Sequence, residues 1–143
     1  MKSLVSPPGT LIDSDLVLAT PGVYSLTIRL PKPDAERVRA SLPKHYDTSR
    51  AIAFDEEGHA VLTFKMWDVT LMPTHRGEKT PQPPPTFARD NKLVKPPVTL
   101  TPGAVVRVSY LPYVWSPLNS AAYYGFEPAH GIYFIALQVL RGA

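Results

Sequence analysis

The sequence predicts a mainly β fold, a small closed or half-closed barrel with one short helix and long loops. Seventeen of the 143 residues are proline, which is more than twice the average usage of about 5%. Proline interrupts long helices because it lacks a backbone N–H. Short runs that alternate apolar and polar residues lie between turn residues, as in half-buried strands. There are roughly five to seven such runs, which favours a small barrel.

The first third of the chain predicts an amphipathic strand and a helix. The opening SPPGTLIDSD (6–15) is polar and proline-punctuated, which indicates an arm or a first turn. Two β-like runs flank the turn pair Pro21-Gly22, and the second (23–30) alternates polar with apolar residues. KPDAERVRASLP (32–43) has an early proline, acids near its start, basic residues later and a final proline. These signals predict one helix of about two turns.

The middle of the chain predicts a strand, a turn and a long strand, followed by a long loop. RAIAF (50–54) has the composition of a strand, and the acids of DEEGH (55–59) are better explained by a solvated turn than by an acid/base pair. AVLTFKMWDVTLM (60–72) predicts a strand with Leu62, Phe64 and Met66 on one face and Lys65 and Trp67 on the other.

A basic, proline-rich segment then extends from residue 73 to residue 97, where only TFARD and NKLV resemble extended structure. A loop of this length in a small domain is usually functional or disordered.

The last third predicts two strands around an aromatic loop. LTPGAVVRVSYLPYVW (100–115) is interrupted by Pro112, which indicates an edge position or a bend. SPLNSAAYYGFEPAHG (116–131) has the composition of a loop, and IYFIALQVL (132–140) is an almost wholly apolar closing strand. No repeat or domain boundary interrupts the pattern, so we expect a single domain over residues 1–143.

Composition excludes several kinds of chemistry. The chain has no cysteine, and its four histidines lie far apart without a ligand partner at helical spacing. No nucleophile motif or phosphate-binding glycine loop is present. We therefore expect no catalytic residues, no metal and no cofactor. Neither a signal peptide nor a membrane span is visible, so we expect a cytoplasmic protein, in the host cell cytoplasm if it is viral.

Aromatic and basic residues concentrate towards the end of the chain. Between residues 110 and 124 lie four tyrosines and a tryptophan, with Arg107 just ahead of them. Stacking of an aromatic ring on a base stabilises a complex with single-stranded nucleic acid by about 1 to 3 kcal/mol per base, and cations bind the phosphates. Together they would make a sequence-tolerant groove for single-stranded nucleic acid. The net charge of +3 permits such a partner without requiring it.

Some of these residues also have ordinary structural explanations. Tyr110 shares a strand face with two valines, so we expect it in the core, whereas Arg107, Tyr113 and Trp115 should be exposed. Trp67 either packs with its indole N–H satisfied or stacks on bases. Arg29 should reach solvent as an ordinary surface arginine or as a phosphate contact. The cations of the proline-rich segment either are solvated or clamp a nucleic-acid strand.

The order of motifs resembles that of a known family. FARDNKLVKPPVTLTPGAVVRVSYLPYVW, a variable loop and GIYFIALQVLRG resemble the end of compact bacteriophage single-stranded DNA-binding proteins, which have an OB-fold. That family's D-x-x-x-x-L segment, G-S-x-V-x-V strand, P-Y-x-W/Y bend and closing strand correspond to residues 89–93, 103–108, 112–115 and 131–139. TFKMW and GVYSLTIRLPKPD resemble its earlier strands. The likeness is close in the second half of the chain and loose in the first.

The resemblance implies an OB-like barrel that binds single-stranded DNA without strong sequence preference in phage DNA replication, recombination or repair. It places Lys65, Arg107, Tyr113 and Trp115 on or near the DNA-binding face. With the residues reasoned from composition, the predicted DNA-binding set is Arg29, Lys65, Trp67, Arg76, Lys92, Lys95, Arg107, Tyr113, Trp115, Tyr123 and Tyr124.

Protein partners are predicted less directly from the sequence than the DNA-binding residues. Many relatives end in an acidic tail that recruits polymerase and helicase, whereas this sequence ends LQVLRGA, so that either the tail was removed or this recruitment route is lacking. The apolar last strand and the aromatic loop would support a homodimer. Two alternatives stay open: a barrel that docks a protein partner through the loop 116–130, and an RNA-binding OB module.

Overall fold

The residues that the structure describes include nine strands and one helix. This computed structural model describes residues 4–17, 23–42, 52–67, 83–95, 98–115 and 129–142. In chain order the elements are β1 (Leu4–Val5), β2 (Gly9–Asp15), β3 (Val23–Leu30), α1 (Lys32–Ala40), β4 (Ile52–Phe54), β5 (Ala60–Trp67), β6 (Thr86–Phe87), β7 (Leu93–Val94), β8 (Val105–Trp115) and β9 (Ala129–Arg141).

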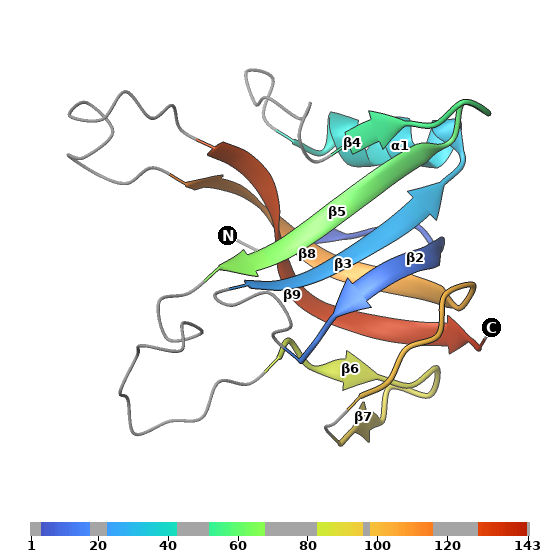
Figure 1. Cartoon of the computed structure of the whole chain (residues 1–143), viewed down its shortest axis with the longest axis vertical. Coiled ribbons are helices and arrows are strands. Elements are labelled where there is room, and N and C mark those ends of the chain that lie inside the picture. The colour runs from blue at the N-terminus through green and yellow to red at the C-terminus, as the bar shows by residue number, and fades with distance from the viewer. Residues whose placement is uncertain are drawn as a thin grey trace.

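The five longer strands form a half-open barrel, as the sequence predicts. They pair in the order β8-β2-β3-β5-β9, and β9 pairs again with β8. The β2–β8 and β5–β9 contacts have only two residue pairs each, so the ring of strands is loosely joined at two places. The β5–β9 pairing is parallel and the other four are antiparallel. Figure 1 shows β2, β3 and β5 in front of β8 and β9.

β3 and β5 divide into an inner and an outer face. They pair in register from Val23 and Trp67 to Leu30 and Ala60. The even-numbered side chains are buried in the barrel, except that Met66 is half-buried. This division is the one that the sequence predicts, because successive side chains of a strand point to opposite faces. The outer face holds Ser25, Thr27, Arg29, Val61, Thr63 and Lys65.

The core encloses Phe64 and Tyr110, as expected for Tyr110. Both side chains are almost fully buried, with ring centroids 5.7 Å apart and a tilt of 55° between the rings. The Tyr110 hydroxyl lies 2.8 Å from Oγ of Ser41, at the end of α1, so the buried oxygen has a hydrogen-bond partner. Burial raises the pKa of Tyr110 above its ordinary value, in spite of the hydrogen bond to Ser41.

α1 confirms the predicted helix. Proline lies in its first turn with Asp34, and Arg37 and Arg39 lie in the last turn, which suits the helix dipole. Ala35 and Val38 are buried against the core. Figure 1 shows α1 and β4 together at one end of the barrel. Within the described ranges, no helix has the length and apolar character needed to cross a membrane.

β2 corrects the expectation of an arm or turn over residues 6–15. Gly9–Asp15 is a strand that pairs with both β3 and β8. Its sequence conceals it because a bulge between Leu11 and Asp13 breaks the alternation and much of the strand faces solvent. A Cβ at Gly9 would lie 2.9 Å from the Ile28 side chain, so only glycine fits this close approach to β3 without rearrangement. The predicted run before Pro21 is a bend at residues 16–17, and 18–22 lie outside the described residues.

β8 and β9 form the longest ribbon of the fold. They pair from Val105 and Arg141 to Trp115 and Ala129. β1 reaches only Ser109 and Tyr110 of β8. At Pro112, in the described part of the chain, β8 therefore pairs on one side only, which is the edge position that the sequence predicts. Figure 1 shows the end of this ribbon projecting beyond the barrel.

The extended pieces predicted in the proline-rich segment form the hairpin β6–β7. Thr86 pairs with Val94 and Phe87 pairs with Leu93. Asn91 in the turn has a φ of 67°, a conformation that asparagine tolerates better than most residues. β6 also lies parallel to β9, so the hairpin extends the sheet beside the barrel. Residues 68–82, which include the end of the strand predicted over 60–72, lie outside the described residues.

Candidate nucleic-acid interface

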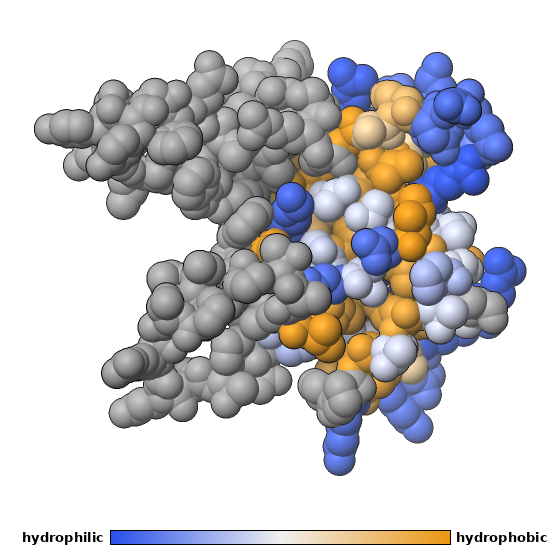
Figure 2. Space-filling model, in the orientation of Figure 1, coloured by the Kyte–Doolittle hydropathy of each residue, from blue (hydrophilic) through white to orange (hydrophobic). Residues whose placement is uncertain are grey.

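The outer face of β3 and β5 is the first candidate surface. Small hydroxyl side chains occupy its middle, where Oγ1 of Thr27 and Oγ1 of Thr63 are 3.3 Å apart. Lys65 lies towards one end of the face and Arg29 towards the other. Figure 2 shows pale and blue residues among orange ones over the strands at the front of Figure 1. In chain order, β3 and β5 are the second and third strands of the barrel. In OB-folds, the face formed by the second and third strands binds oligonucleotides.

Arg29 is held by the turn between β4 and β5. Its Nε donates to Oδ2 of Asp55 at 2.8 Å, and its Nη2 donates to Oε2 of Glu57. Nη2 is also 3.0 Å from Nδ1 of His59. Arginine is only a donor, so in this contact Nδ1 of His59 is the acceptor and carries no proton. The exposure expected for Arg29 is therefore only partial, with 36% of its side chain accessible, and its charge is paired.

These contacts shift the pKa values of the ion pair. The hydrogen bond to Glu57, with the contact to Asp55, raises the pKa of Arg29 above its ordinary value although burial opposes this. Burial acts to raise the pKa of Asp55, but hydrogen bonds from the backbone of His59, from Arg29 and from the backbone of Glu57 together lower it. The ionised Asp55 therefore stabilises the fold above the ordinary aspartate pKa of about 3.9, and that contribution is lost as the pH falls through its lowered value.

Acids border the same face along β2. Asp13 pairs with Thr27 and Asp15 pairs with Ser25, so both lie beside the outer face of β3 by register. With Asp55 and Glu57 at the other end, the face is not a continuous positive surface. Positive charge on this side of the barrel is therefore local, and Lys65 is its exposed cation among the described residues of β3 and β5.

The second candidate surface lies on the side of the barrel that carries the β6–β7 hairpin. Arg107 of β8 pairs with Gln138 of β9, and its side chain is half-buried, so the exposure expected for it is only partial. Nε2 of Gln138 donates to the carbonyl oxygens of Ala88 and Arg89, both at 3.2 Å, and to Oδ1 of Asn91 at 2.8 Å. Gln138 thereby fixes the hairpin against β9. The exposed cations in and beside the hairpin are Arg89, Lys92 and Lys95, and Arg141 is exposed at the end of β9.

The barrel separates these two surfaces. β8 is divided from the β3–β5 pair by β2 on one side and by β9 on the other. Arg107 and Lys65 therefore lie on different sides, although the sequence groups them. Lys92 and Lys95 lie with Arg107, whereas Arg29 lies with Lys65.

The remaining predicted residues are placed only by backbone or not at all. Tyr113 pairs with Gly131, and Trp115 pairs with Ala129, in the projecting part of the β8–β9 ribbon. Trp67 pairs with Val23 at the end of β5. Residues Arg76, Tyr123 and Tyr124 lie outside the described residues.

Sequence reasoning missed two features of these surfaces. It gave no role to Gln138, whose amide connects β9 to the hairpin, or to His59 beside Arg29. The polar Gln138 within the otherwise apolar run IYFIALQVL was the available signal for the first. No group of three or more histidine, aspartate and glutamate side chains in the described ranges is placed to hold a metal ion.

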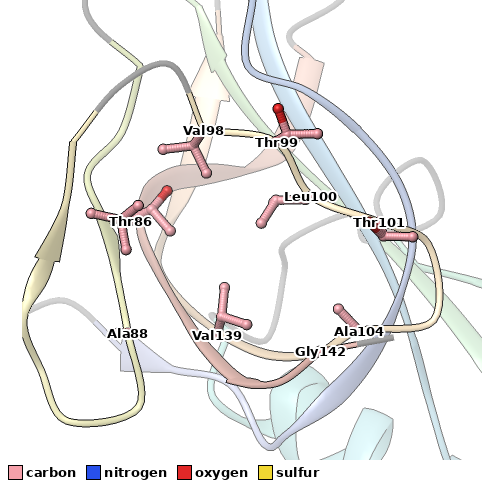
Figure 3. A pocket seen from close by; sticks show the side chains of 10 residues that line it. Thr86, Ala88, Val98, Thr99, Leu100, Thr101, Ala104, Val139 and Gly142 are labelled. Atoms are coloured by element: carbon pink, nitrogen blue, oxygen red, sulfur yellow. The ribbon is translucent and has the colours of Figure 1, made fainter.

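A pocket of about 330 Å³ opens between the β6–β7 hairpin, residues 98–104 and the end of β9. Figure 3 shows Leu100 and Val139 pointing into it from opposite sides. Val98 and Ala104 make its lining more apolar. Thr86 also lines the pocket, and its buried Oγ1 has no hydrogen-bond partner in the described part of the structure. A buried hydroxyl without a partner costs free energy.

Replacing Thr86 by valine should therefore stabilise the protein. Valine keeps the shape of the side chain and removes the unpaired hydroxyl, so we expect the free energy of unfolding to rise by about 1 kcal/mol. Thr63→Val is the control, because Oγ1 of Thr63 has a partner in Thr27, and it should cost about 0.5 to 1.5 kcal/mol. Urea unfolding of both variants measures the difference. A loss of stability in Thr86→Val would show that the hydroxyl is hydrogen-bonded, for example to water.

The comparisons with known proteins give matches in structure. No family model matches the chain, and no curated protein matches its sequence. The crystal structure of gp2.5, a single-stranded DNA binding protein encoded by bacteriophage T7, matches with a TM-score of 0.62 and 14% identity, over 100% of this chain and 93% of that one. The single-stranded DNA-binding protein from bacteriophage Enc34 matches with a TM-score of 0.64 and 11% identity, over 98% and 81%.

The Enc34 protein has also been solved in complex with ssDNA. That structure has a TM-score of 0.64 and 10% identity, and the match covers 99% of this chain and 88% of that chain. At such identities the likeness is one of fold. It extends over the whole barrel, including the first half of the chain, where the motif resemblance is loose. The chain has the fold of these phage single-stranded DNA-binding proteins.

Proposed function

We propose that this protein binds single-stranded DNA without strong sequence preference and acts in phage DNA replication, recombination or repair. The observation that carries the proposal is the match over 99% of the chain to a structure solved with ssDNA. The local chemistry agrees, because cations flank a polar face on the second and third strands of an OB-type barrel. In this proposal residues 1–143 act as one domain, by binding alone and without catalysis.

The proposed contacts divide between the two surfaces. Phosphates would contact Lys65 on the β3–β5 face and Arg107 on the hairpin side, with Lys92 and Lys95 beside it. β9 separates these surfaces on one side of the barrel and β2 separates them on the other, so a DNA strand that contacts both must cross β9 or β2. The proposed stacking residues are Trp67, Tyr113, Trp115, Tyr123 and Tyr124, and further phosphate contacts are Arg29 and Arg76.

Two partner assignments belong to the same proposal. Proteins of the replication machinery, polymerase and helicase among them, are expected to act on the same DNA. A homodimer would use the apolar β9 and the aromatic segment that precedes it. Sedimentation of the protein alone and with DNA tests directly whether it is a homodimer.

Binding to oligonucleotides tests the function. We expect labelled oligo-dT of about 30 nucleotides to bind in fluorescence anisotropy at low salt, and more weakly as salt is added. Each neutralised phosphate contributes about −0.7 to the slope of log K against log salt for single strands. A duplex of the same length should bind more weakly. An RNA oligonucleotide of matched sequence serves as a competitor.

Each arm of this experiment has a separate meaning. Tight, salt-sensitive binding that prefers the DNA single strand supports the proposal. Stronger competition by RNA would assign the same barrel to RNA. An absence of binding at low salt would reject nucleic-acid binding, and salt-independent binding would reject the role of the cations.

A further inference from the structure

Arg29 forms a cluster with Asp55, Glu57 and His59 of the turn before β5. In this cluster, the carboxylate of Glu57 lies at a position that suits a phosphate. We propose that Arg29, held in place by Asp55 and His59, forms a phosphodiester subsite at the end of the β3–β5 face, and that the carboxylate of Glu57 occupies it when DNA is absent. The inference rests on the proposed function and adds a built-in competitor to it. Glu57 is the stand-in for the phosphate oxygens.

The geometry defines the subsite. Nη2 of Arg29 donates to Oε2 of Glu57 and lies 3.0 Å from Nδ1 of His59. Oε2 of Glu57 is 3.7 Å from the same Nδ1. A phosphate oxygen in the place of Oε2 would accept the same charge-assisted hydrogen bond from Arg29.

The two carboxylates that hold Arg29 differ in how firmly they are fixed. Asp55 is 28% exposed, and its Oδ1 accepts from the backbone N–H of Glu57 at 2.9 Å and of His59 at 3.0 Å. Its Oδ2 accepts from Nε of Arg29. Asp55 is thus a positioning residue that keeps the guanidinium in place.

Glu57 is the partner that can leave. Its side chain is 71% exposed, and the contacts described for it are those to Arg29 and His59. Exposed ion pairs add little net stability, because both charges are well solvated when apart. A phosphate on a strand already bound elsewhere is at high local concentration, so it can displace Glu57 while Asp55 remains.

The subsite lies in line with the rest of the face. Arg29 and Ser25 are on the same side of β3, and Ser25 pairs with Lys65. Four strand residues span about 13 Å, so a DNA strand that starts at Lys65 reaches Arg29 within a few nucleotides. There it meets the carboxylate of Glu57. Glu57 therefore weakens the binding of DNA at this end of the face.

Glutamine substitutions in the turn provide a matched pair. Glu57→Gln and Glu56→Gln each remove one negative charge from neighbouring positions, but the ion pair to Arg29 belongs to Glu57. We expect Glu57→Gln to lower the Kd for oligo-dT by about 3- to 10-fold and to steepen the salt slope by about 0.7, the value of one more phosphate contact. Glu56→Gln should change the Kd less than about 2-fold and leave the slope unchanged.

Arg29→Gln tests the origin of the gain. In an Arg29→Gln background, Glu57→Gln should no longer improve binding, because the guanidinium that it releases is absent. Circular dichroism melting of each variant checks the fold. Glu57→Ala is the second variant, because alanine also removes the carboxylate and should give the same gain.

The outcomes separate the subsite from the proposed function. Equal gains in Glu57→Gln and Glu56→Gln, or a gain that persists without Arg29, would show a general charge effect and overturn the subsite. Weaker binding by folded Glu57→Gln and Glu57→Ala would overturn it too. Failure of the wild type and of every variant to bind DNA would overturn the proposed function itself.

Discussion

Replacing Phe64 by alanine should lower the free energy of unfolding by about 3 to 5 kcal/mol. Phe64 is fully buried on the inner face of β5, where its ring contacts Tyr110, and its backbone pairs with Leu26 and Ile132. The truncation would leave a cavity at the place where β3, β5 and β9 meet. Because domains of this size are stable by about 5 to 15 kcal/mol, the loss is a large part of the total.

Urea unfolding followed by circular dichroism measures this prediction. Phe54→Ala is the control, because Phe54 is 49% exposed on β4 and should lose about 1 kcal/mol or less. Phe64→Leu keeps an apolar side chain in the site and should cost about 1 to 2 kcal/mol, so it remains measurable if the alanine variant does not fold. A Phe64→Ala loss no larger than that of Phe54→Ala would show that the barrel core is not packed as described.

The amphipathic parts of the fold could be predicted from the sequence because their patterns are local. The alternation over 24–30 and 60–66 assigns both faces of β3 and β5 correctly. An early proline, with acids before basic residues, predicts α1, and the run of acids followed by glycine predicts the turn before β5. Tyr110 follows its valine neighbours into the core. Each of these signals lies within about a dozen residues.

The rest of the fold depends on contacts between distant residues. β2 was missed because its bulge and its exposed positions remove the period-2 pattern, and its strand character comes from pairing with β3 and β8. The parallel contact of β5 with β9 joins Phe64 to Ile132, and no local signal announces it. The order of strands around the barrel is therefore a property of the whole chain.

The candidate site shows the same limit. The sequence identified the cations but could not show that Arg29 is paired with Asp55 and Glu57, which are 26 and 28 residues away. Nor could it show that Arg107 and Lys65 lie on different sides of the barrel. Side-chain pairing and the division into surfaces follow from strand order, which composition and spacing do not contain.

Reversing the charge of Lys65 should weaken the binding of single-stranded DNA by about 10-fold or more. Lys65 is exposed on the β3–β5 face, and Ser25, its partner in β3, pairs in turn with Asp15 of β2. Lys65→Glu would remove a phosphate contact and extend the negative border onto the face. Because the side chain is exposed, the fold should persist, and circular dichroism melting checks this.

Two further variants turn this prediction into a map of the DNA path. Arg39→Glu makes the same charge change at an exposed position in the last turn of α1, outside the strands of both surfaces, and should weaken binding by less than about 2-fold at moderate salt. Arg107→Glu makes a matching reversal on the hairpin side. A large loss for Lys65→Glu alone assigns the DNA to the β3–β5 face, and a large loss for Arg107→Glu alone assigns it to the hairpin side. Large losses for both require a strand that crosses β9 or β2, and losses no larger than that of Arg39→Glu would contradict the role of both cations.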